Sequence, residues 1–282
     1  MKYGMNLFLW TDDMHDGMLS VLEQIKKIGF DGVEVPLFDL NLDKWRTWAK
    51  RLDDLGLERT AVTVCSEEAN PISQDPAVRA RGVDLLKQTL DCCQALGAYS
   101  LNGPLHSGLG IFSGKAPSAQ EWEWAVENLK KVSEHAAACD VLLGIEFINR
   151  FENYFLTCTA DALRFVREID HPNCRMMYDT FHAHIEEKNV AEAIRSCAED
   201  LILVHTSEND RSTPGSGGVN WDTTFDTLKE INYDGWLTIE AFGQSLEDLL
   251  AATKIWRRMY ESEEQLARDG LKFLKQEVAK RW

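Results

Sequence analysis

Four residues that can bind a divalent metal each stand directly at the end of a short apolar segment. They are Glu146, Asp179, His205 and Glu240, and they follow one another at intervals of about 30 residues, roughly one strand, one helix and their turns. A short continuous apolar run is typical of a strand buried on both faces of a parallel sheet. Such folds place their active sites at the C-terminal ends of the strands. We therefore expect the four side chains to meet at one end of a parallel sheet.

Three carboxylates and one imidazole make a mostly oxygen donor set. Such a set favours Mn²⁺, with Co²⁺, Mg²⁺ and zinc as the alternatives, over an ion that seeks thiolates. The ion can hold two adjacent oxygens of a ketose, polarise the carbonyl and stabilise the enediolate formed when a neighbouring C–H bond is lost. Glu146 and Glu240, on non-neighbouring strands, are then the acid and base on opposite faces of one carbon.

Each of the four also has a simpler interpretation. Glu146 and Glu240 could form salt bridges at the rim, Asp179 could cap the helix that follows it, and His205 could be a core histidine. Their occurrence at equivalent positions of consecutive strands favours a metal site over these separate explanations.

The elements that would position these residues alternate from one end of the chain to the other. We expect strands at Gly4–Trp10, Gly32–Leu37, Glu58–Cys65, Tyr99–Leu105, Val141–Ile148, Arg175–Asp179, Leu201–His205 and Trp236–Glu240. We expect helices at Met14–Ile28, Asp43–Leu55, Pro76–Leu96, Ser118–Asp140, Thr159–Ile169 (capped by Thr157 or Thr159), Val190–Cys197, Trp221–Ile231 and Leu246–Tyr260. An extra charged helix, Glu263–Lys280, is expected to present a solvated face. The count predicts an α/β fold, a single (β/α)8 TIM barrel domain over residues 1–282 with an extra C-terminal helix.

Composition narrows the class of partner. The chain has 282 residues and a formal net charge of −16, without a strong basic cluster, which argues against nucleic acid. No apolar run approaches the length of a membrane span, and the N-terminus lacks the pattern of a signal segment. The seven cysteines show no zinc or redox spacing. They indicate the reduced thiols of a cytoplasmic protein. Because no apolar run is long enough, we expect no membrane partner.

Four sequence motifs resemble those of a known enzyme family. Glu146-Phe-Ile-Asn-Arg-Phe-Glu152, Tyr178-Asp-Thr-Phe-His182, His205-Thr-Ser-Glu-Asn-Asp-Arg211 and Thr238-Ile-Glu240 resemble the ketose 3-epimerases for D-tagatose, D-psicose and L-ribulose. These belong to the xylose-isomerase-like barrel superfamily, and the resemblance covers nearly the whole chain.

The resemblance implies roles for individual residues. Glu146, Asp179, His205 and Glu240 would bind Mn²⁺ or Co²⁺, and the two glutamates would also transfer the proton. Glu152, His182 and Arg211 would hydrogen-bond the sugar hydroxyls near the carbonyl. A homodimer or homotetramer is also implied, since members of the family are commonly oligomeric.

The chain departs from the better-known members around the distal end of the sugar. Asn6 stands where the first strand of those members tends to carry an aromatic residue. Ser66 and His106 are further candidate contacts for terminal hydroxyls, although each is as compatible with a plain loop. These positions would decide which ketose is preferred, and the sequence leaves that choice open.

We therefore expect a metal-dependent ketose 3-epimerase that inverts C3 of a free ketose through a metal-bound enediolate. The alternative on the same metal set is an aldose–ketose isomerase or a hydroxypyruvate isomerase, which returns the proton to the carbonyl carbon. A dehydratase would call for more basic residues, and an abasic-site DNA nuclease would call for more histidines and a basic groove. A non-catalytic sugar-binding protein would not require two opposed glutamates.

Overall fold

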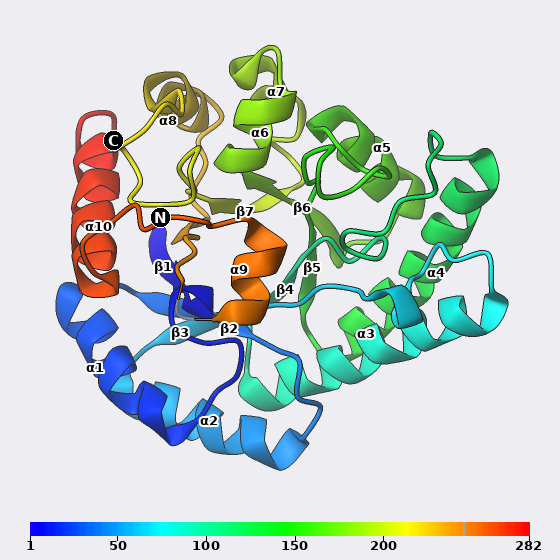
Figure 1. Ribbon diagram of the computed structural model, residues 1–282, viewed down its shortest axis with the longest axis horizontal. Helices are drawn as coiled ribbons and strands as arrows, with labels where there is room; N and C mark the ends of the chain where they lie inside the picture. The colour runs from blue at the N-terminus through cyan, green and yellow to red at the C-terminus, as the bar shows by residue number, and fades with distance from the viewer. Residues whose placement is uncertain (245) are drawn as a thin grey trace.

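Parallel strands close into a barrel that is ringed by helices. The computed structural model describes residues 1–244 and 246–282, and over these residues the strands pair in sequence order from β1 to β8, with β8 closing onto β1 (Figure 1). The strands are β1 Lys2–Asn6, β2 Gly32–Pro36, β3 Glu58–Val62, β4 Ser100–Gly103, β5 Leu142–Ile145, β6 Cys174–Asp179, β7 Leu201–His205 and β8 Trp236–Ile239. The expected (β/α)8 barrel is confirmed.

The helices follow the strands around the ring. They are α1 Leu19–Ile28, α2 Leu42–Leu55, α3 Pro76–Leu96, α4 Ala119–Ala138, α5 Thr159–Ile169, α6 Thr180–Glu186, α7 Val190–Ser196, α8 Trp221–Glu230, α9 Glu247–Thr253 and α10 Glu263–Ala279. In the described residues, no helix combines the length and apolar composition needed to cross a bilayer.

Local chemistry sets several helix boundaries. The side chain of Asp75 accepts a hydrogen bond from Ala77 N at the start of α3, with Pro76 in the first turn. The helix ends at Gly97, whose φ of 70° is the left-handed conformation that glycine adopts without strain. At α4, Ser118 and Glu121 form a reciprocal capping box. The cap at Asp75, Pro76 in the first turn and the terminal Gly97 explain why α3 has the predicted bounds.

Other boundaries differ from the predictions. The first strand ends at Asn6, and Leu7–Leu9 forms a 3-10 turn instead of more strand. The expected threonine cap of α5 is wrong, because Cys158 holds the N-cap position, and its side chain makes no capping hydrogen bond to the backbone of the first turn. The backbone N–H of Thr159 donates instead to Glu187. The short helix α6, which begins directly after β6, was not among the predicted helices.

The segment after β8 differs most. The helix expected over Leu246–Tyr260 is confined to α9, Glu247–Thr253. Beyond it, Ile255 and Met259 pack on Phe8 and Phe242, which follow β1 and β8. This segment therefore covers the C-terminal end of the barrel (Figure 1).

The C-terminal helix is present, and opposite the expected solvated face it has a buried face that was not predicted. In Figure 1, α10 occupies the place in the ring between α8 and α1, and it contacts both helices and β8. Ala267, Leu271 and Leu274 are buried on one face. Their spacing of four and three residues puts them on a single stripe, which packs this helix against the barrel although it is rich in charged residues.

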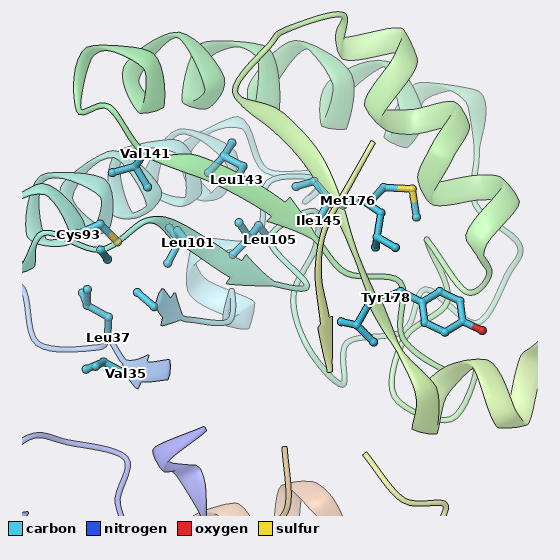
Figure 2. Packing of buried hydrophobic residues seen from close by; sticks show 14 of the residues in the cluster. Val35, Leu37, Cys93, Leu101, Leu105, Val141, Leu143, Ile145, Met176 and Tyr178 are labelled. Carbon is cyan, nitrogen blue, oxygen red and sulfur yellow. The ribbon is translucent and has the colours of Figure 1, made fainter. Parts of the chain in front are cut away.

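Alternate residues of the strands face the helices and the barrel interior. Leu101 of β4 and Leu143 of β5 pair across the sheet and belong to the large apolar cluster that also includes Cys93 of α3 (Figure 2). Their neighbours Asn102 and Gly144 therefore point to the other face. A Cβ at Gly144 would lie 2.3 Å from Asn102 Oδ1. The barrel interior beneath the C-terminal end is thus tightly filled with polar groups.

We expect Leu274→Ala to lower the free energy of unfolding by about 2–5 kcal/mol, because it empties buried space between α10 and the barrel. Lys272→Ala on the exposed face of the same helix is the matched control, with an expected change within about 0.5 kcal/mol. Denaturant unfolding followed by circular dichroism measures both. Equal effects of the two substitutions would contradict the packing of α10 described above.

Candidate metal centre

Glu146, Asp179 and Glu240 surround the Nδ1 atom of His205 at the C-terminal end of the barrel. Nδ1 lies 3.4 Å from Glu240 Oε1, 3.6 Å from Asp179 Oδ2 and 4.0 Å from Glu146 Oε1. His205 and Asp179 are fully buried, and the two glutamates are 5–6% exposed. The ends of β5, β6, β7 and β8 thus bring together the four residues that the sequence singled out.

The ring of His205 is oriented by a further carboxylate, that of Glu34, on the side away from this cluster. Its Nε2 lies 2.6 Å from Glu34 Oε2, whereas Nδ1 is buried without a hydrogen-bond partner among the described residues. Ligand atoms about 2.0–2.4 Å from one ion lie roughly 3–4 Å from one another. The spacing, the partnerless nitrogen and the three acidic groups around it therefore fit a divalent cation.

Asp179 serves two purposes at once. Its Oδ1 accepts a hydrogen bond from Phe181 N and so caps α6, while Oδ2 accepts one from Ser207 Oγ and faces His205. The helix-cap interpretation and the ligand interpretation are therefore compatible, because each uses a different oxygen.

The electrostatics show how crowded the site is. Burial and the neighbouring Glu240 raise the pKa of Glu146 well above its usual range. Burial raises the pKa of Glu240 to about 8. Burial alone would raise the pKa of Asp179 too, but the neighbouring histidines lower it to about 2. Burial opposes a charge on His205, yet Glu34 and Glu240 raise its pKa well above the usual value.

His182 presents a hydrogen-bond donor beside this cluster. Its Nδ1 accepts a hydrogen bond from Asn149 N, so the ring proton is on Nε2, which lies 3.6 Å from Glu146 Oε1. Burial lowers the pKa of His182 to about 4, which keeps the ring neutral. A neutral imidazole with a fixed N–H is suited to donate to a substrate oxygen.

Arg211 is enclosed rather than solvated. Its guanidinium stands 4.1 Å from the ring centre of Phe181 and 4.9 Å from that of Phe242, and Nη2 donates to Glu152 Oε2 at 3.2 Å. Burial alone would raise the pKa of Glu152, but Arg211 beside it lowers that pKa. The structure thus brings Glu152, His182 and Arg211 together beside the four central residues.

The other three predicted contacts lie in different surroundings. Asn6 is fully buried, and its Nδ2 lies 2.8 Å from Glu34 Oε2 and 3.4 Å from Glu240 Oε1. His106 is also buried, with its Nε2 3.0 Å from the backbone oxygen of Glu146 and its Nδ1 against Ser107 Oγ. Ser66 is exposed at the start of a 3-10 turn. A substrate contact for these three residues stays a prediction.

Sequence reasoning overlooked Glu34. It is a carboxylate inside the apolar strand Gly-Val-Glu-Val-Pro, the same signal that drew attention to Glu146. Glu34 stands in the middle of its strand, whereas the other four residues stand at strand ends. A pattern of polar residues at strand ends therefore does not include it.

A second group of metal-binding types lies on the outer helices. His135 and Cys139 are one turn apart on α4 and its C-cap, and both contact Asp91 of α3. His135 Nε2 is 2.7 Å from Asp91 Oδ1, and Cys139 Sγ donates to the same oxygen. Because these groups satisfy one another, they suggest a metal less strongly than the barrel-end cluster does.

Comparison with known proteins shows the family of this chain. The chain matches the xylose isomerase-like TIM barrel family over residues 22–277. The chain belongs to this family. It is 33% identical to D-psicose 3-epimerase of Enterocloster bolteae, covering 96% of this chain and 92% of that protein. It is 30% identical to a probable ketose 3-epimerase of Synechocystis, covering 98% and 96%. These relatives are named as ketose 3-epimerases, and the chain is accordingly an enzyme of the isomerase class.

Two solved structures of sugar 3-epimerases have the same fold as this chain. An L-ribulose 3-epimerase superposes with a TM-score of 0.93 at 31% identity, covering 99% of this chain and 95% of the other. A D-allulose 3-epimerase from Methylomonas, solved with D-allulose, superposes with a TM-score of 0.92 at 27% identity, covering 100% and 97%.

We expect the metal-free enzyme to lose thermal stability as pH rises from 6 to 9. Glu240 and His205 hold protons in the folded state that they release on unfolding, because their folded pKa values are raised. This contribution is complete below the unfolded pKa and is lost as pH rises through the folded value, about 8 for Glu240. Mn²⁺ needs deprotonated ligands, so its affinity should increase over the same window.

Differential scanning fluorimetry with chelator, and then with Mn²⁺, measures both trends. Glu240→Gln should flatten part of the decline in the metal-free protein. A melting temperature of the metal-free wild type that stays constant or increases between pH 6 and 9 would contradict the charge arrangement.

Proposed function

We propose that this enzyme epimerises free ketoses at C3, taking the proton from one face of the carbon and returning it to the other. The observation that carries the proposal is the arrangement of two buried glutamates around one imidazole nitrogen. Glu146 follows β5 and Glu240 follows β8, so they approach from different sides of the barrel, and both have raised pKa values. Carboxyl groups whose pKa values are raised in this way are suited to accept and return a proton.

The two glutamates need a substrate whose C3 proton is acidified. A divalent cation held by Glu146, Asp179, His205 and Glu240 would polarise the C2 carbonyl and stabilise the negative charge of the enediolate. One glutamate then removes the C3 proton onto a carboxylate oxygen, and the other delivers its proton to the opposite face. Which of them acts as the base depends on the configuration of the substrate.

The neighbouring residues would orient the sugar. His182 Nε2–H is a neutral donor beside Glu146, and the Arg211 guanidinium supplies a fixed positive charge. Glu152 can accept from a hydroxyl while it holds Arg211 in place. These groups would bind the oxygens near the carbonyl, and burial by the segment after α9 would limit access of water.

The substrate class follows from the relatives. Curated relatives are named for D-psicose and L-ribulose, so a free ketohexose or ketopentose is the substrate we propose. Asn6, Ser66 and His106 stay our candidates for selection at the distal end of the sugar. Because Asn6 and His106 are engaged inside the protein, we propose that they act by shaping the site.

Three further features belong to the proposal. Mn²⁺ is the metal we favour, with Co²⁺ and Mg²⁺ as alternatives, because three of the four donors are carboxylates. The cysteines are all free thiols, and all lie in the described part of the chain, which supports a cytoplasmic location. A homodimer or homotetramer is the assembly we propose.

We expect deuterium at C3, together with the C3 epimer, when the Mn²⁺-loaded enzyme is incubated with ketoses in D₂O. D-fructose, D-tagatose, D-psicose, D-sorbose, L-ribulose and hydroxypyruvate are tested in turn by ¹H and ¹³C NMR. Glu146→Gln and Glu240→Gln should each lower the epimerisation rate by roughly 10²–10⁴-fold at saturating Mn²⁺, because each removes one proton-transfer group.

Glu277→Gln is the matched control, since Glu277 is also a buried glutamate but lies on α10 among Lys280 and Arg281. It should leave the rate unchanged. Label at C1, with an aldose or tartronate semialdehyde as product, would assign the enzyme to the isomerase alternative. Near-normal rates in either site variant would refute the two-glutamate mechanism.

A further inference from the structure

Glu34 is a fully buried carboxylate on which hydrogen-bond donors from four other strands converge. Its Oε1 accepts from Asn102 Nδ2 at 2.8 Å and from Thr60 Oγ1 at 3.3 Å. Its Oε2 lies 2.8 Å from Asn6 Nδ2 and 2.6 Å from His205 Nε2. The donors come from β1, β3, β4 and β7, so Glu34 links strands on both sides of the barrel.

The orientation of Asn6 is fixed independently. Its Oδ1 accepts a hydrogen bond from Phe8 N at 2.8 Å, so its Nδ2 must be the group that faces Glu34 and Glu240. Three of the four partners of Glu34 are therefore side chains that donate through an amide or a hydroxyl. Each of these donors needs an acceptor, and the two carboxylate oxygens of Glu34 supply it.

The consequence for His205 concerns the position of its ring proton. A carboxylate 2.6 Å from Nε2 keeps the proton on that nitrogen. The lone pair of Nδ1 then faces Asp179, Glu146 and Glu240, and a metal ligand needs that lone pair. Without an acceptor at the position of Glu34, either tautomer and other ring orientations become available.

We propose that Glu34 is a positioning residue of the metal centre, which holds His205 with its proton on Nε2 and its Nδ1 toward the cation, and which steadies Glu240 through Asn6. The proposal rests on the proposed metal site and is independent of which ketose is converted. Outer partners of this kind orient the ligating imidazole and increase its basicity.

A purely structural role is the competing explanation, because a buried acid with four donors also ties strands together. Thr60→Val separates the two. It removes a donor from the same carboxylate, in the same buried cluster, but on the oxygen that faces away from His205. If metal affinity depended only on the stability of the cluster, Thr60→Val would weaken metal binding as much as a substitution of Glu34 does.

We expect Glu34→Leu to weaken Mn²⁺ binding by roughly 100-fold and Glu34→Gln by roughly 10-fold, the range that outer partners of metal ligands span. Glutamine keeps an acceptor for His205 but loses the charge. It should also fold, because Asn102 Oδ1 has no partner among the described residues and can accept from the new amide after its own amide turns. Thr60→Val should bind Mn²⁺ within about twofold of the wild type.

Free Mn²⁺ is measured by electron paramagnetic resonance during titration of the chelator-treated protein, with melting temperatures to verify folding. The ¹⁵N shifts of the histidine rings, assigned with His205→Gln and recorded with Mg²⁺, report the tautomer. The wild type and Glu34→Gln should carry the proton of His205 on Nε2, and Glu34→Leu should give a mixture.

Folded Glu34 variants that bind Mn²⁺ as tightly as Thr60→Val, or a proton of His205 on Nδ1 in the wild type, would overturn the proposal. If Glu34→Leu does not fold, the affinity and the tautomer of Glu34→Gln decide. Neither the Mn²⁺ affinity nor the tautomer of His205 depends on turnover. A protein without ketose epimerase activity would therefore refute the proposed function and leave this inference standing.

Discussion

The structure depends on holding several acidic side chains together, out of water, around one imidazole nitrogen. Carboxylates so close to one another repel, and burial adds a further cost to each charge. The raised pKa values of Glu146 and Glu240 are the direct sign of that cost. A divalent cation would offset both effects at once. Under the proposed mechanism the same two glutamates also transfer the proton, so metal binding and acid–base chemistry would both depend on a single electrostatic arrangement.

The barrel makes this arrangement possible because it fixes the backbone of each ligand separately. Strand ends supply the four central residues, and the turns behind them supply supporting bonds, such as the cap of α6 on Asp179. Beneath the site, Asn6, Glu34 and Asn102 form a polar layer within the barrel. Beside it, Arg211 is held between two aromatic rings and paired with Glu152.

The sequence was informative where short-range chemistry decides structure, and less so where distant packing decides it. Parallel strands, and the carboxylates and histidine at their ends, were predictable because buried strands are continuously apolar and these polar residues interrupt that pattern at equivalent places. The bounds of α3 follow from Pro76 and Gly97. The break after α9 and the burial of α10 were not predictable, since they depend on which helix fills the last place in the ring. Glu34 and the direction of Asn6 were missed because the partners of an interior polar group belong to strands distant in sequence.

A crystal of the Mn²⁺-loaded enzyme, with anomalous data collected near the manganese edge, tests the central claim most directly. The account predicts one strong peak per chain bound by Glu146, Asp179, His205 and Glu240, with His205 coordinating through Nδ1. A peak only at the Asp91–His135–Cys139 cluster, or coordination of the barrel-end ion without the two glutamates, would contradict it.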